Sequence, residues 1–142
     1  MKIMFFCSET SDREGEAKAA SSLGQVYLQM GEFEKAKTYH RMDYDLSEAS
    51  EDAEGKIRAL SHIALTEEAM GNIVEAVGAQ ENHLSLANKQ NHLSSRVQAL
   101  ASLGRLHFNL GQVDASVSYL EQALAATEGT DERQDEAIIR YR

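Results

Sequence analysis

Small and apolar residues recur along this chain with a period of 40 residues. Glycine occupies one column at Gly31, Gly71 and Gly111. Other columns hold matching residues: Ala19, Ala59 and Ala99; Leu23, Ile63 and Leu103; Gly24, Ala64 and Gly104; Phe33, Ile73 and Val113; Tyr44, Leu84 and Leu124. A period between about 20 and 50 residues is the signature of a stacked array of similar supersecondary units. The pattern therefore predicts a repeat protein.

Each repeat is expected to contain two helices joined by a short turn. In the first repeat, Ala20, Leu23, Tyr27 and Leu28 follow one another at helical spacing. Gly31 follows, where glycine can take a positive φ and end the helix. A second helix is predicted from 32 to about 47, and the same pattern occurs at 58–87 and 98–127. Proline is absent, so nothing interrupts these helices.

The repeats predict an all-α fold, a solenoid of stacked helix-turn-helix units in one repeat domain. The expected divisions are 1–12 for the end of a preceding unit, 13–50 for unit one, 51–90 for unit two, 91–128 for unit three and 131–142 for the start of a truncated fourth unit. The small residue at 24, 64 or 104 is expected to let paired helices approach closely. Apolar ends without capping repeats predict self-association through Met4, Phe5, Phe6, Ile138, Ile139 and Tyr141.

The column spacing resembles the tetratricopeptide pattern. The matching positions are Leu23, Gly24, Tyr27, Gly31, Ala36 and Tyr44, and the usual unit of about 34 residues is extended here to 40. The resemblance implies a right-handed tetratricopeptide-repeat solenoid that binds proteins. Three segments, 41–46, 63–71 and 83–87, are most similar to Tonsoku-like proteins, and the next resemblance is to LGN/Pins-type scaffolds.

Each resemblance implies a different cellular role. A Tonsoku-like chain would be a nuclear scaffold in replication-coupled DNA repair, with a Mms22-like partner or histone machinery. An LGN/Pins-like chain would be a cytoplasmic adaptor in cell polarity or signalling. LGN-type units typically carry Asn where this chain has Gln25, Leu65 and Arg105, which weakens that alternative. A structural fragment with no separate function is the third reading.

Composition narrows the class of partner. The net charge of −9 argues against direct binding of nucleic acid, because phosphate binding needs clustered Lys and Arg. No apolar run approaches the roughly 18 residues of a membrane helix. Cys7 is the single cysteine and cannot form an internal disulfide, which fits a reducing intracellular compartment. The expected ligand is therefore a protein or peptide, and neither a nucleic acid nor a membrane.

Candidate chemistry is sparse. Five residues fit a calcium-loop template, Asp43, Asp45, Ser47, Glu51 and Glu54, but Glu48 replaces the glycine that the loop requires. The five histidines show no zinc spacing. His40 and Asp43 lie three residues apart on one helix face and are expected to be able to hydrogen-bond. No nucleophile or phosphate loop accompanies them, so we predict no enzyme, no cofactor and no metal.

The first helices of this repeat class line a concave face, which is the predicted peptide-binding groove. Its residues are Lys18, Gln25, Leu28, Gln29, Arg58, His62, Leu65, Gln98, Arg105, Phe108 and Asn109. They combine positive charge, side-chain amides and apolar anchors. That mixture suits an extended or helical peptide. The alternative is that they are ordinary solvated residues of the helix faces.

Overall fold

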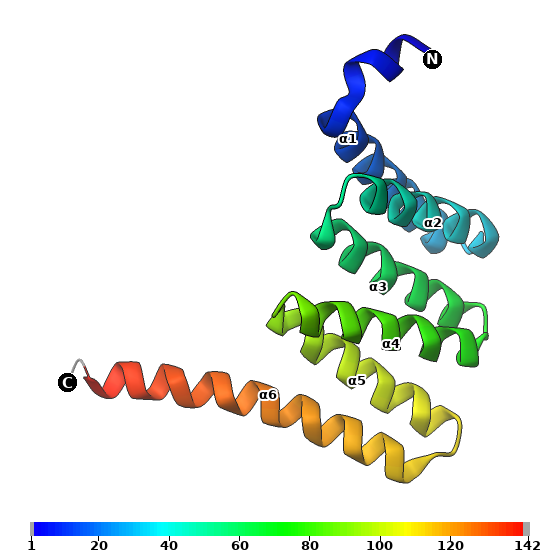
Figure 1. Ribbon diagram of the computed structural model, residues 1–142. Coiled ribbons are helices and arrows are strands. Elements are labelled where there is room, and N and C mark those ends of the chain that lie inside the picture. The colour runs from blue at the N-terminus through cyan, green and yellow to red at the C-terminus, as the bar shows by residue number, and fades with distance from the viewer. Residues whose placement is uncertain (1, 141–142) are drawn as a thin grey trace. The chain divides into compact units, whose positions relative to one another are not determined.

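The computed structural model describes the backbone of residues 2–140 and the side chains of residues 12–128. Within that range the chain forms six helices and no strand (Figure 1), so the predicted all-α fold of helix-turn-helix repeats is confirmed. They are α1 (Lys2–Gln29), α2 (Phe33–Ala49), α3 (Ala53–Ala69), α4 (Ile73–Lys89), α5 (Leu93–Asn109) and α6 (Val113–Arg140). The helices form two compact parts, an N-terminal half (1–82) and a C-terminal half (83–142), which divide within α4.

A residue with a left-handed backbone ends each of the first five helices. These residues are Gly31 (φ 81°), Glu51 (55°), Gly71 (84°), Asn91 (54°) and Gly111 (81°), at intervals of 20 positions. The left-handed glycines confirm the turns predicted from the 40-residue period. The period did not predict the turns at Glu51 and Asn91, because neither residue is a glycine. Asn nevertheless tolerates a positive φ better than most residues do.

The five turns also share one hydrogen-bond pattern, which satisfies the last carbonyls of each helix. At the first turn, the Gly31 amide donates to the Leu28 carbonyl at 3.0 Å and the Glu32 amide donates to the Tyr27 carbonyl at 2.9 Å. Because the turns are evenly spaced and equally short, α2, α3, α4 and α5 all contain 17 residues. Neighbouring helices therefore have matching lengths.

Glycine in the first helix of a pair allows the second helix to approach closely, as the sequence predicts. A Cβ on Gly24 would lie 2.6 Å from the His40 ring. A Cβ on Gly104 would lie 2.6 Å from Leu120 Cγ. Both distances are too short for a real contact, so a side chain at either position would push the paired helices apart.

The first and last helices are longer than the four between them. α1 is continuous from Lys2 and α6 is continuous to Arg140, so the described backbone has no turn where residues 1–12 and 131–142 were expected to form separate helices. Continuing a helix satisfies its backbone hydrogen bonds without help from a neighbour. The unit boundaries remain a prediction, and the residues predicted to make the ends associate lie outside the described side chains.

Apolar residues are exposed on the first and last helices. Leu23 of α1 is 42% exposed, whereas the equivalent Ile63 and Leu103 are 5% and 0% exposed. On α6, Leu120 and Leu124 are 46% and 59% exposed. A repeat buries one helix face only against its neighbour. Residues of one sequence column are therefore buried in the central helices and exposed to solvent on α1 and α6.

Replacing Gly31 with alanine tests the left-handed turn. Nothing lies within 4 Å of a Cβ at this position, so the cost of Gly31→Ala is backbone strain alone. We expect the free energy of unfolding to fall by about 1–2 kcal/mol in urea denaturation. The reciprocal change Glu51→Gly should stabilise the protein by relieving the same strain. Equal stability of Gly31→Ala and wild type would contradict a left-handed backbone at this turn.

Candidate functional site

A buried ion pair joins α2 to α3 beneath the predicted binding face. The side chain of Asp43 is fully buried, and Arg58 donates to it twice, from Nη2 to Oδ1 at 2.6 Å and from Nε to Oδ2 at 3.1 Å. The Ser47 hydroxyl also donates to Oδ1 at 3.4 Å. The hydrogen bonds to Asp43 outweigh burial and raise the pKa of Arg58. These two hydrogen bonds hold the guanidinium of Arg58 against α2.

The ion pair corrects two predictions. Arg58 was expected to offer positive charge to a ligand, but its charge is compensated by Asp43 and its side chain is only 29% exposed. Asp43 was expected to be able to hydrogen-bond His40, but Arg58 and Ser47 occupy its oxygens. The sequence carries one signal for this pair: Asp43 is a charged residue in a column where the repeat usually has a small one.

His40 is fully buried beside this pair and neither ring nitrogen has a hydrogen-bond partner. Its ring faces Gly24 and lies 4.7 Å from the His62 ring, measured between centroids. Burial, with a further contribution from His62, lowers the pKa of His40 to about 4, and Asp43 only partly offsets it. His40 is therefore neutral at physiological pH, and its ring fills the space that Gly24 leaves.

His62 links the buried seam to the exposed face of the N-terminal half. Gln25 Nε2 lies 2.9 Å from His62 Nε2, and Ser21 Oγ lies 3.5 Å from His62 Nδ1. If the Gln25 amide donates, the proton of the neutral ring lies on Nδ1 and faces Ser21. Burial also lowers the pKa of His62. The structure thus brings together Gln25 and His62, two of the predicted groove residues, across α1 and α3.

The other predicted groove residues differ in exposure. In the N-terminal half, Lys18, Gln25, Gln29 and Leu65 are exposed, and Leu28, Arg58 and His62 are half-buried. In the C-terminal half, Gln98, Arg105, Phe108 and Asn109 are all exposed along α5. Phe108 is 63% exposed, a large fraction for an aromatic side chain. The face of α5 therefore offers more accessible side chains than the face of α3.

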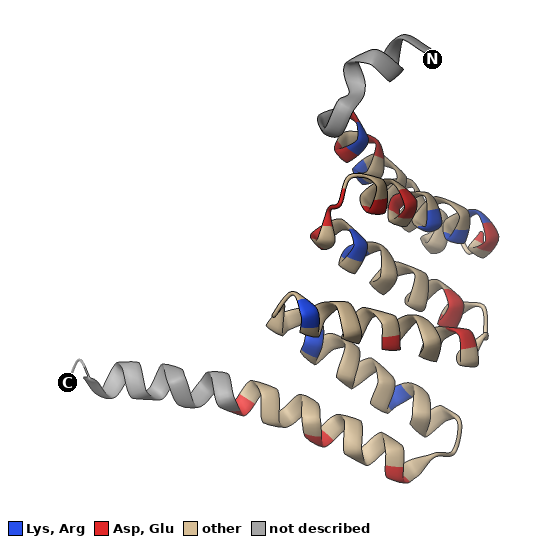
Figure 2. Ribbon diagram, in the orientation of Figure 1, with Lys and Arg blue, Asp and Glu red and all other residues tan. Residues whose placement is uncertain are grey.

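Charge is unevenly distributed among the helices. α5 contains Arg96 and Arg105 and no acidic residue, although the whole protein has a net charge of −9 (Figure 2). Over 113–128, where its side chains are described, α6 contains three acidic residues and no basic one (Figure 2). Charges farther away than about 8 Å are largely screened at physiological salt, so the charge that a ligand on α5 meets is set by α5 itself and by the side chains packed against it.

The described residues contain no metal-binding cluster and no membrane-spanning helix. Among them, no group of three or more His, Cys, Asp or Glu side chains could hold a metal ion. None of the described helices is long and apolar enough to cross a membrane.

Two stretches of the chain match models of the tetratricopeptide repeat, residues 17–40 and residues 96–130. The chain is also 29% identical over 105 residues to tetratricopeptide repeat protein 29 of Trypanosoma brucei brucei. That alignment covers 73% of this chain but only 22% of the length of the relative. These similarities support the repeat class, and they give no support to the narrower resemblance to Tonsoku-like or LGN/Pins-type proteins.

Solved structures share the fold at low sequence identity. The tetratricopeptide domain of Arabidopsis FLU matches with a TM-score of 0.76 and 18% identity, over 82% of this chain and 98% of that one. Aspartyl phosphate phosphatase F of Bacillus subtilis matches with a TM-score of 0.77 and 20% identity, over 81% of this chain and 30% of that one. At such identities the likeness concerns the fold alone.

Removing the arginine of the buried pair should destabilise the protein. Arg58→Leu leaves the Asp43 carboxylate buried without its partner, which we expect to cost about 2–4 kcal/mol in urea denaturation. Arg41→Leu, at an exposed arginine of α2, is the matched control and should change stability by less than about 0.5 kcal/mol. Equal stabilities for the two variants would contradict a structural ion pair.

The buried His40 should make stability depend on pH. Its folded pKa of about 4 lies below the ordinary value of 6.5. Between these values the unfolded chain binds a proton that the folded chain does not, so stability falls as pH falls through this window and is unaffected above it. From pH 7.5 to pH 5, wild type should lose about 2 kcal/mol more than His40→Gln in urea denaturation.

Gln is a suitable replacement for His40 because Gln80 occupies the equivalent position of α4, where it is 2% exposed. His83, whose pKa burial also lowers, is present in both proteins and cancels in the comparison. Identical pH dependence of the two proteins would show that His40 is not held neutral by the fold.

Proposed function

We propose that this chain, which contains tetratricopeptide repeats, is a protein-interaction scaffold that binds peptide segments of partner proteins on the exposed faces of its first helices. The observation that carries the proposal is the pair of exposed side chains on α5, Phe108 and Arg105. An aromatic side chain that remains 63% exposed is costly to leave in water and is a typical anchor at protein interfaces.

The chemistry of α5 favours an acidic peptide with one apolar anchor. Arg105 and Phe108 are three residues apart, so they project from the same side of the helix. The exposed amides of Gln98 and Asn109 supply hydrogen-bonding groups on the same helix. Lys18 in the N-terminal half and Arg105 in the C-terminal half are the exposed cations among the residues predicted for this face.

The cellular role rests on sequence resemblance alone. The segments at 41–46, 63–71 and 83–87 favour the repeat segment of a Tonsoku-like factor in replication-coupled DNA repair, acting in the nucleus with a Mms22-like partner or histone machinery. An LGN/Pins-like adaptor in the cytoplasm is the alternative. Affinity purification of the full-length gene product from cell extract distinguishes them, because recovery of replication-repair proteins or of polarity proteins supports one role and argues against the other.

Binding should depend on the anchor more than on the charge. With a partner peptide identified by that purification, Phe108→Ala should weaken binding by about 2 kcal/mol, or roughly 30-fold in Kd, by fluorescence anisotropy. Arg105→Ala should cost less, and its effect should shrink as salt rises, because an exposed charge is screened.

Val117→Ala is the control for this series, since Val117 is an exposed apolar residue of α6 in the same half of the protein. It should bind as wild type does. If all three variants bind alike, the partner does not use the α5 face.

A further inference from the structure

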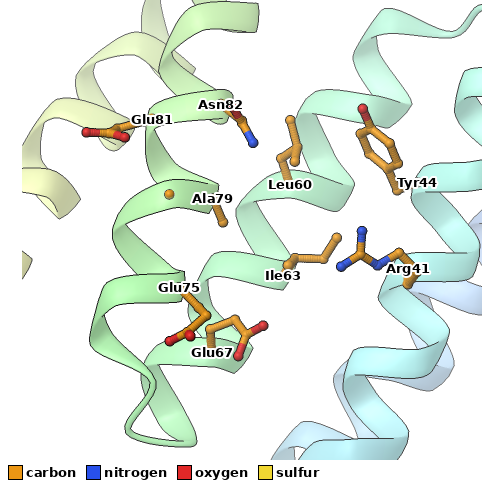
Figure 3. Close-up of a pocket in the computed structure, with 10 residues that line it drawn as sticks. Arg41, Tyr44, Leu60, Ile63, Glu67, Glu75, Ala79, Glu81 and Asn82 are labelled. Atoms are coloured by element: carbon orange, nitrogen blue, oxygen red, sulfur yellow. The ribbon is translucent and has the colours of Figure 1, made fainter.

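The N-terminal half contains a groove on a different surface from the predicted binding face. It lies between α2 and α4, with α3 beneath it, and its volume is about 470 Å³ (Figure 3). Leu60 and Ile63 of α3 line its floor, with Tyr44 of α2 on one side and Ala79 of α4 on the other. A volume of this size falls within the range of about 300–1,000 Å³ typical of ligand sites. The groove can therefore accept an apolar side chain.

Gly78 of α4 keeps this groove open. It lies in the middle of a 17-residue helix and has a helical backbone, so its presence is not required by a turn. A Cβ at this position would meet nothing within 4 Å. The equivalent positions of the neighbouring second helices are Thr38 and Ser118. The missing side chain thus leaves space at the groove wall that the rest of the fold does not fill.

Acidic side chains dominate the charge of the groove. Three carboxylates and one guanidinium line it, a net charge of −2. Glu67 is buried and already compensated, because Lys37 Nζ lies 3.1 Å from it and Asn72 donates to it at 2.9 Å. Glu75 and Glu81 are exposed, and neither has an ion pair within the described part of the chain. These two carboxylates are available to a ligand.

We propose that this groove binds a basic peptide segment of a partner protein. One apolar side chain of the segment packs over Leu60 and Ile63 beside Gly78, and flanking Lys or Arg side chains meet Glu75 and Glu81. The carboxylates disfavour phosphate groups and acidic peptides. The groove therefore selects a ligand whose charge is opposite in sign to that of the ligand expected on α5. The site therefore gives the protein a second binding surface with a different partner chemistry.

A designed peptide tests the site directly. The probe is a ten-residue peptide with two central leucines flanked by lysines, and the matched peptide has serines in place of the leucines. Both are titrated into the full 142-residue chain labelled with ¹⁵N. The leucine peptide should shift the amide signals of 78–82 in a saturable way, and the serine peptide should bind at least ten-fold more weakly. Equal binding of the two peptides would overturn the proposal, because charge alone would then explain it.

Filling the groove provides a second test. Gly78→Leu places a side chain in the open space and should weaken the leucine peptide at least ten-fold. Its thermal melting temperature should not fall, because leucine forms helix better than glycine and its Cβ meets no other atom within 4 Å here. Thr38→Leu, at the equivalent exposed position of α2, is the matched control and should bind as wild type does. Unchanged binding by Gly78→Leu would overturn the site.

The charge requirement is tested separately. The double variant Glu75→Gln with Glu81→Gln should weaken the leucine peptide several-fold and should reduce the dependence of its Kd on salt. An unchanged salt dependence would contradict the assigned role of these carboxylates. Because every residue changed in these experiments lies in the N-terminal half, the outcome is independent of binding on α5.

Discussion

The repeated left-handed turn is the constraint on which the rest of this structure depends. A residue with positive φ stands at 31, 51, 71, 91 and 111, and the same pair of hydrogen bonds ends the helix before each one. Equal spacing makes the four central helices equal in length. Helices of equal length can pack small residues of one against large residues of the other along their whole length. The residues that recur every 40 positions need this kind of packing. The close approach of Gly24 to His40 is one such match.

Polar residues inside the seam between α2 and α3 have consequences for function. His40 and Asp43 occupy buried positions, where an uncompensated polar group is costly. Gly24 gives the His40 ring its space, and Arg58 neutralises Asp43 through two hydrogen bonds. This compensation reduces the positive charge that Arg58 can offer to a ligand. The exposed cations of the predicted face are then Lys18 on α1 and Arg105 on α5.

Two surfaces with opposite electrostatic character follow from these helices. α5 contains only basic charged residues and presents an exposed aromatic ring, whereas the groove over α3 has two exposed carboxylates at its edge and an apolar floor. Both lie on rigid helices, which hold side chains more precisely than loops do. We propose that the first surface binds an acidic segment and the second a basic one.

The sequence by itself determined the repeat, the all-α fold and the three glycine turns, because helical periodicity and the backbone freedom of glycine are local properties. The side chains that it placed on one face of α5 are exposed in the structure, and their role in binding stays a prediction. Only the tertiary structure decided that Arg58 pairs with Asp43, that Leu23 is exposed while Ile63 is buried, and that Gly78 lines a groove. Each of those outcomes depends on which atoms of another helix lie opposite a residue, and spacing along one helix does not contain that information.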